Sequence, residues 1–281
     1  MGLFSGLEQL GLGNFANAKL MEEKKSDTTV AGLDTKKAPD IREEDVLYDR
    51  KYTCPVCDRG FTTRTVRAGK LKLIGKDTDL RAFYEVADPH KYDVITCDMC
   101  GYSAVSRYFN NLSNRQIKDI KENFVSKFRG ISNDKTIFSY DDAVLRYKLA
   151  LVCSIVKHAK NSEKAYTSLK MAWILRGKRL SLNPNDTEIK KLYAEEMECI
   201  TNAYACFVEA LSTEVLPIAG MDENTLKYLM SDLARRLKKY DESAKLLAEV
   251  ITSKATPARL KDEALNLKEL LKEDIKKNGR Q

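Results

Sequence analysis

The chain has 281 residues, of which 43% are hydrophobic and 32% charged, with a net charge of +7 and a mean hydropathy of −0.43. This composition supports a buried core, and no apolar run approaches the roughly 18 residues that span a bilayer, so we expect a soluble protein with no membrane partner. No basic stretch precedes the apolar N-terminal residues, as it would in a signal peptide, and seven cysteines without one indicate the reducing cytoplasm.

Residues 1–51 are predicted to form a flexible leader and a charged tether. The first twenty residues are apolar but interrupted by glycines, and the following thirty carry few large apolar side chains. Such a composition buries too little surface to offset the entropy of ordering. We expect the leader to dock on a partner, to dock on the same protein or to remain free, and the folded part to begin near Tyr52.

Two C-x-x-C knuckles follow, Cys54-Pro-Val-Cys57 and Cys97-Asp-Met-Cys100, with 39 residues between them. Together they supply the four thiolates that tetrahedral zinc prefers. We therefore predict one zinc per chain, with rubredoxin-type iron as the alternative metal. Four cysteines fill the coordination sphere and leave no position for water or substrate, so the metal is predicted to be structural.

Short strands are predicted around these knuckles. One pair of strands is expected at residues 61–67 and 70–74, joined at Gly69, whose missing side chain permits the positive φ of a tight turn. A further strand is expected at residues 92–96, leading into Cys97. Residues 52–104 are thus predicted to form a small β zinc-ribbon module.

The loop that the metal closes contains two sets of polar residues. Asp77, Asp79, Arg81 and Tyr84 form a candidate polar site, since two carboxylates two positions apart are able to bind a cation or act as acid and base. The competing interpretation is that they form a turn cap and ordinary ion pairs. Six basic residues are candidate nucleic-acid contacts, namely Arg59, Arg64, Arg67, Lys70, Lys72 and Lys76.

Beyond residue 104 the hydrophobic period becomes helical. Residues 105–140 are predicted to hold a connecting helix, which a Ser113–Gln116 capping box begins, and a loop. Residues 141–281 are predicted to form a tetratricopeptide-like helical domain, with an unrelated helical bundle as the alternative. Three small–large–small triplets support the repeat, although their spacing exceeds the ideal of about 34 residues. They are Ala165, Leu169 and Ala172; Ala203, Phe207 and Ala210; and Ser243, Leu247 and Val250.

The residues around the knuckles also resemble a known family. The stretches 52–57, 76–84, 88–89 and 92–104 are similar to the bacterial family named domain of unknown function 2225. The resemblance implies a cytosolic metal-binding protein in which the four knuckle cysteines are the ligands, followed by tetratricopeptide-like helices. It implies no activity.

The expected fold class is α+β with segregated domains, a small β zinc ribbon followed by a mainly α, tetratricopeptide-like array. No cysteine or serine has a recognisable nucleophile setting, and His90 is expected to be a solvent-exposed loop residue. The sequence therefore favours a non-enzymatic protein whose helical groove binds a protein or peptide. The alternative is a nucleic-acid-binding zinc ribbon joined to a helical partner-binding domain.

Overall fold

A computed structural model describes residues 41–278 of the chain, so the predicted leader lies outside the described residues. Regular structure starts ahead of Tyr52, with a 3-10 turn at Glu43–Val46 and strand β1 at Leu47–Thr53. The last part of the predicted tether is therefore a strand. None of the helices within 41–278 is long and apolar enough to cross a membrane.

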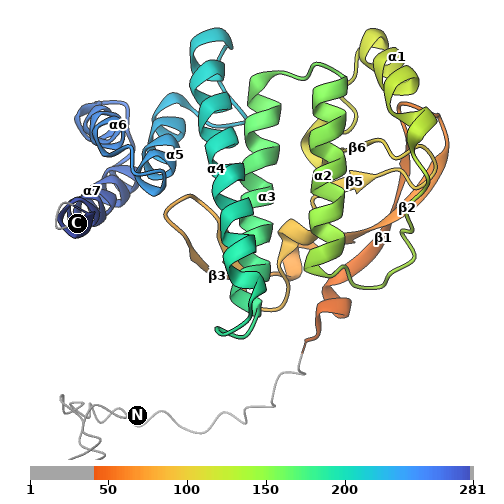
Figure 1. Cartoon of the computed structure of the whole chain (residues 1–281), viewed down its shortest axis with the longest axis horizontal. Coiled ribbons are helices and arrows are strands. Elements are labelled where there is room, and N and C mark those ends of the chain that lie inside the picture. The colour runs from red at the N-terminus through yellow and green to blue at the C-terminus, as the bar shows by residue number, and fades with distance from the viewer. Residues whose placement is uncertain (1–40, 279–281) are drawn as a thin grey trace, which may run out of the picture. The chain divides into compact units, whose positions relative to one another are not determined.

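Six strands in this part of the chain pair as three separate antiparallel hairpins (Figure 1). Strand β1 pairs with β2 (Gly60–Val66) in an unbroken register that places Leu47 opposite Val66 and Thr53 opposite Gly60. Strand β3 (Leu73–Lys76) pairs with β4 (Ala82–Tyr84), and β5 (Val94–Thr96) pairs with β6 (Ser103–Val105). The strand predicted before Cys97 is confirmed as β5.

The predicted hairpin around Gly69 is wrong. Residues 68–70 form a 3-10 turn, and β2 pairs with β1 instead of with the chain beyond Gly69. The first knuckle is the reason: the amide of Cys54 donates to the carbonyl of Arg59, so the knuckle itself is the turn that joins β1 to β2. Leu73 is exposed on β3.

Seven helices follow in residues 114–278: α1 (Asn114–Asn123), α2 (Tyr140–Val156), α3 (Asn161–Ser181), α4 (Glu188–Thr213), α5 (Glu223–Arg236), α6 (Tyr240–Thr252) and α7 (Ala258–Asn278). The Ser113–Gln116 capping box is present at the start of α1, as predicted. A second capping box begins α2, where Ser139 is the N-cap and Asp142 is the third helical residue. These side chains satisfy amides that the first turn leaves without partners.

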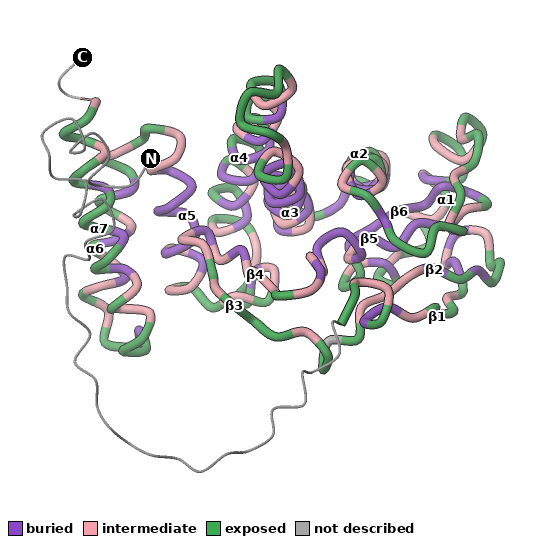
Figure 2. Tube along the Cα trace, turned by 90° about the horizontal axis from the view of Figure 1, so that it is seen from below, coloured by how far each residue is buried: buried purple, intermediate pink, exposed green. Residues whose placement is uncertain are grey.

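Helix α3 is the central element of the helical region. It packs between α2 and α4, and thirteen of its 21 residues are buried, so much of its trace is purple in Figure 2. Leu169, Ala172 and Ile174 lie in the main hydrophobic core. Complete burial of a leucine or isoleucine side chain stabilises a fold by roughly 1.5–3 kcal/mol. Helices α5, α6 and α7 continue the array and enclose a smaller cluster of their own.

The three predicted triplets are core positions. All nine of their side chains are buried, on α3, α4 and α6 in turn. The small residues permit close approach of neighbouring helices, which pack about 8–10 Å apart. Val152 of α2, by contrast, is exposed.

Candidate metal centre

Each C-x-x-C knuckle is the turn of one hairpin. The amide of Asp58 donates to the carbonyl of Cys54, and the amide of Gly101 donates to the carbonyl of Cys97, both at 2.9 Å. The residue after each knuckle has a positive φ, 59° at Asp58 and 75° at Gly101. Glycine is needed at the second position, since a Cβ there would lie 2.5 Å from the ring of Phe128.

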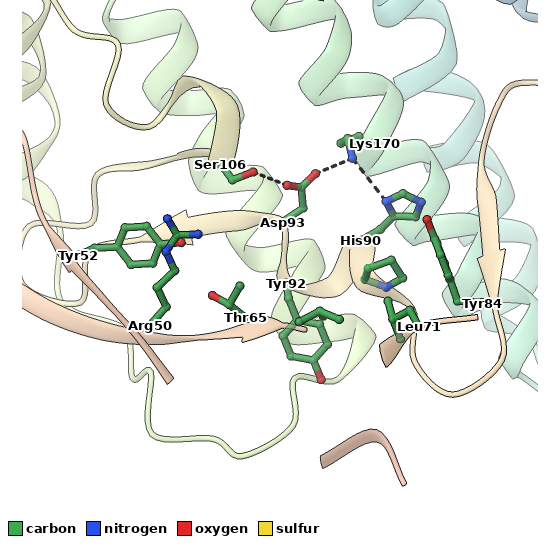
Figure 3. Close-up of a pocket in the computed structure, with 12 residues that line it drawn as sticks. Arg50, Tyr52, Thr65, Leu71, Tyr84, His90, Tyr92, Asp93, Ser106 and Lys170 are labelled. Carbon is green, nitrogen blue, oxygen red and sulfur yellow. Dashed lines mark hydrogen bonds and ion pairs between the residues drawn. The ribbon is translucent and has the colours of Figure 1, made fainter. Parts of the chain in front are cut away.

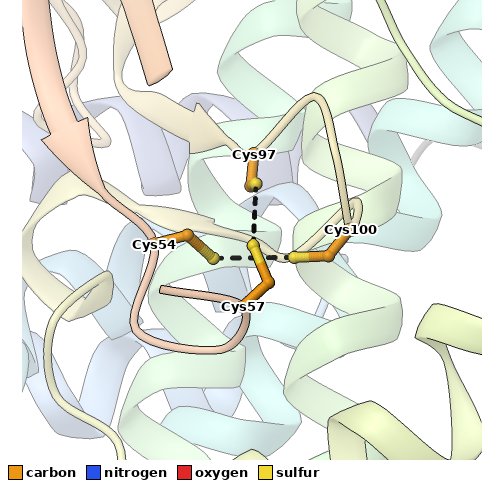
Figure 4. Close-up of side chains that lie close together, drawn as sticks. All are labelled: Cys54, Cys57, Cys97 and Cys100. Atoms are coloured by element: carbon orange, nitrogen blue, oxygen red, sulfur yellow. Dashed lines mark hydrogen bonds between the residues drawn. The ribbon is translucent and has the colours of Figure 1, made fainter. Parts of the chain in front are cut away.

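The two hairpin turns bring the four cysteines together (Figure 4). Their sulfur atoms all lie within 4.8 Å of one another, with Sγ–Sγ distances of 3.5 Å from Cys54 to Cys100 and 3.7 Å from Cys57 to Cys97. Tetrahedral zinc with bonds of about 2.3 Å separates its sulfur ligands by about 3.8 Å. A disulfide needs about 2.05 Å, so the cluster has the dimensions of a metal site.

The close approach of the four thiols also favours a bound cation. Hydrogen bonds from Cys100 and Cys54 lower the pKa of Cys97 to about 2, whereas hydrogen bonds with Cys54 and Cys97 raise the pKa of Cys100 far above its usual value. Sulfurs this close share protons because several negative charges cannot accumulate in one place without compensation. A divalent metal ion would supply that compensation and displace the protons.

An aromatic and aliphatic shell surrounds the sulfurs. Tyr52, Phe61 and Phe109 pack on one another with ring centroids 5.9 to 6.0 Å apart, and they belong to the same hydrophobic cluster as Cys54. This cluster also includes Ile120 of α1 and Cys153 of α2. The hairpins that carry the cysteines thus share a core with the first helices.

The side chains of the candidate polar site have different partners. Asp77 and Asp79 both accept hydrogen bonds from the guanidinium of Arg176, at 2.6 and 2.7 Å. The Arg81 guanidinium instead donates to Asp88 at 2.9 Å. Tyr84 lines one cavity with His90 (Figure 3) and a second one with Arg81.

Asp77 and Asp79 belong to a buried ionic network that joins the β3–β4 loop to three helices. Arg176 of α3 also pairs with Glu196 of α4, and Arg236 of α5 pairs with Asp77 and with Asp232. Burial would raise the pKa of Asp77, but Arg236 and Arg176 lower it below its usual value. The helical members of the network were not predicted from the sequence, because they are scattered along α3, α4 and α5 without a motif.

Three of the six candidate nucleic-acid contacts are paired with carboxylates of the same chain. Arg64 pairs with Asp49 at 3.2 Å, Lys72 with Glu85 at 3.4 Å and Lys76 with Glu263 at 2.7 Å. The Arg67 guanidinium lies over the ring of Tyr48. Arg59 and Lys70 are exposed. Intramolecular pairing therefore lowers the charge that this segment offers to phosphates.

The prediction that His90 is an exposed loop residue is wrong. Its side chain is only 8% exposed, and its ring centroid lies 4.9 Å from that of Trp173 on α3. Burial and the neighbouring Lys170 lower the pKa of His90 to about 4, so the imidazole is neutral near pH 7. No local pattern predicts the burial of His90, because the residues that cover it lie about 80 positions further along the chain.

A family model described as "Uncharacterized protein conserved in bacteria (DUF2225)" matches residues 47–271. This match extends over both the knuckles and the helices and confirms the resemblance inferred from the sequence. No curated protein and no solved structure matches the chain.

Proposed function

The chain belongs to the DUF2225 family of bacterial proteins, and we propose from its geometry that it is a non-enzymatic, cytoplasmic zinc-binding protein with a tetratricopeptide-like interaction scaffold. The zinc holds two hairpins together, and the helices bind a protein or peptide. The observation that carries the proposal is the closed set of four cysteine sulfurs, three of them buried and one half-buried.

A closed ligand set favours a structural over a catalytic metal. A catalytic zinc keeps one position open for water or substrate, whereas four thiolates occupy all the positions of a tetrahedral ion. Metal binding contributes about 10–16 kcal/mol to the folding of small zinc domains. The metal would therefore stabilise two-stranded hairpins, which are marginally stable when isolated.

Helix α2 presents the surface that favours an interaction role. Leu145, Val152 and Ile155 are 48%, 43% and 64% exposed, and their spacings of seven and three place them on one side of the helix. The opposite side of α2 packs on α3 and β6. Stacked helices commonly offer such faces to partners, and an amphipathic helix of the partner would match the stripe with its own apolar residues.

Site-specific crosslinking tests the scaffold. A photo-reactive residue at position 152, in the full chain expressed in bacterial cytosol, should yield crosslinks to specific proteins, and Ile155→Asp in the same chain should abolish them. Leu265→Asp, which alters a 47% exposed leucine of α7, is the control and should leave the crosslinks unchanged. Both variants should retain one zinc per chain by elemental analysis.

Two results would contradict this proposal. One is an identical set of crosslinks in the two variants, which would remove α2 from the interaction. The other is binding of DNA or RNA that weakens steeply between about 50 and 200 mM salt and depends on Arg59 and Lys70, which would favour the nucleic-acid alternative.

A further inference from the structure

A small cavity lies between α6 and α7, which pack against each other as the last two helices among residues 41–278 (Figure 1). All of its lining residues belong to these two helices, and we call it the α6–α7 cavity. Its volume is about 160 Å³, below the roughly 300–1,000 Å³ of small-molecule sites. A cavity of this size suits a single large apolar side chain of a partner.

The α6–α7 cavity is open to solvent, and its inner surface is apolar. Ala244 and Ala248 of α6 are exposed, and Ile275 of α7 is 44% exposed. Leu247 and Leu271 also line it, and both are buried in the hydrophobic cluster of α5, α6 and α7. A side chain that enters from solvent therefore reaches this cluster, and its burial there removes apolar surface from water.

The lining residues of α6 favour a helix as the element that covers the cavity. Ala244, Ala248 and Ile251 are separated by four and three positions, so they lie on one side of α6. Two alanines one turn apart permit the close approach of another helix, since small residues allow the shorter helix–helix distances of about 8–10 Å. Helices that dock in such sites present their own apolar side chains at the same spacings.

The α7 side of the cavity is positively charged. Lys268 and Lys272 line it one turn apart, and both are exposed. Lys268 forms no ion pair with any residue from 41 to 278, and Lys272 pairs with Glu269, which does not line the cavity. Within the described part of the chain, the lining includes no carboxylate. The rim therefore complements a partner that carries carboxylates beside its apolar residues.

We propose that the α6–α7 cavity binds an acidic amphipathic helix of another protein. One large apolar side chain of that helix fills the cavity, and its carboxylates lie beside Lys268 and Lys272. A second copy of this chain that presented the same face would place lysines against lysines, which disfavours self-association there. The proposal rests on the interaction role proposed above but uses residues outside α2, so either surface can fail without the other.

Two synthetic peptides of about 20 residues test the charge preference. Both have leucines at heptad positions a and d, and the flanking positions are glutamates in one peptide and lysines in the other. The fluorescence anisotropy of each labelled peptide is titrated with the full zinc-loaded chain. The glutamate peptide should bind saturably and about tenfold more tightly than the lysine peptide at about 50 mM salt. Higher salt should narrow this difference, because it screens exposed charges.

Variants of the full chain locate the binding site. Ile275→Asp should weaken binding of the glutamate peptide about tenfold or more, whereas Leu270→Asp, at a 38% exposed leucine of α7 outside the cavity, should not. A double variant with glutamine in place of Lys268 and Lys272 should bind both peptides with similar affinity. Ile155→Asp on α2 should leave the binding of the glutamate peptide unchanged, which separates this cavity from the surface proposed above.

Several results would overturn the proposal. They are no saturable binding of the glutamate peptide, equal affinities of the two peptides for the unaltered chain, and equal effects of Ile275→Asp and Leu270→Asp. Loss of binding in Ile155→Asp alone would place the peptide on α2. Binding to vesicles of anionic phospholipid that Ile275→Asp abolishes would assign the cavity to a membrane surface. A dimer in sedimentation experiments that the same variant abolishes would assign it to a second copy.

Discussion

Replacement of Arg176 by methionine tests whether the buried ionic network holds the β3–β4 loop against the helices. The Arg176 guanidinium donates to Glu196 and Asp77 at 2.6 Å each and to Asp79 at 2.7 Å. Asp79 is fully buried and Glu196 nearly so. The substitution therefore leaves buried carboxylates with fewer cations while keeping most of the side-chain volume.

The loss of stability in Arg176→Met depends on which cations remain beside the three carboxylates. Removal of one partner from a buried ion pair costs about 3–5 kcal/mol. Glu196 keeps Arg179 at 2.9 Å and Asp77 keeps Arg236 at 3.1 Å, whereas the nearest remaining guanidinium nitrogen lies 4.0 Å from Asp79. One of the three carboxylates thus loses its close cation, which favours the lower end of the range, about 3 kcal/mol.

Urea unfolding followed by circular dichroism at pH 7, with zinc present, measures this cost. Arg176→Met should lower the free energy of unfolding by about 3 kcal/mol, and a second change, Asp79→Asn, should restore part of it by removing the uncompensated charge. Lys272→Met breaks an exposed pair with Glu269 and should cost much less than Arg176→Met, because water screens the attraction between exposed charges. If the two methionine variants cost the same, the network does not stabilise the fold as argued.

Three further outcomes are expected. Cys97→Ser should lose the zinc, measured by elemental analysis, and with it the hairpin structure; full retention of metal would contradict the ligand assignment. Ala172→Leu should lower the urea midpoint of the full chain by the equivalent of about 1–3 kcal/mol, because Ala172 is fully buried in the packed core, whereas Lys160→Leu at an exposed site should not. The free energy of unfolding should decrease as the pH is lowered from about 6.5 to 4, because His90 binds a proton in the unfolded chain at a higher pH than in the folded chain. This decrease should reach about 3 kcal/mol. His90→Phe should abolish the pH dependence, whereas His158→Asn, a change at the exposed second histidine, should leave it in place.

The sequence alone determined the features that depend on local spacing. Four cysteines in two C-x-x-C knuckles predict a shared site, because each knuckle places two sulfurs on one side of a turn whatever surrounds it. The capping box at Ser113 and the buried triplets of α3, α4 and α6 follow from hydrogen bonding within one turn and from the helical period. Family membership was also readable from these stretches.

Only the tertiary structure decided which segments meet. The partner of β2 is β1, because the first knuckle turns the chain back on itself and so sets the register, whereas the Gly69 signal is equally compatible with the 3-10 turn that forms. His90 is buried because α3 covers it. The carboxylate of Asp79 accepts a hydrogen bond from Arg176, which lies 97 residues further along the chain, and no local sequence pattern predicts such a pair. Ion pairs and cavities arise where distant elements pack, so their chemistry becomes visible only in the folded chain.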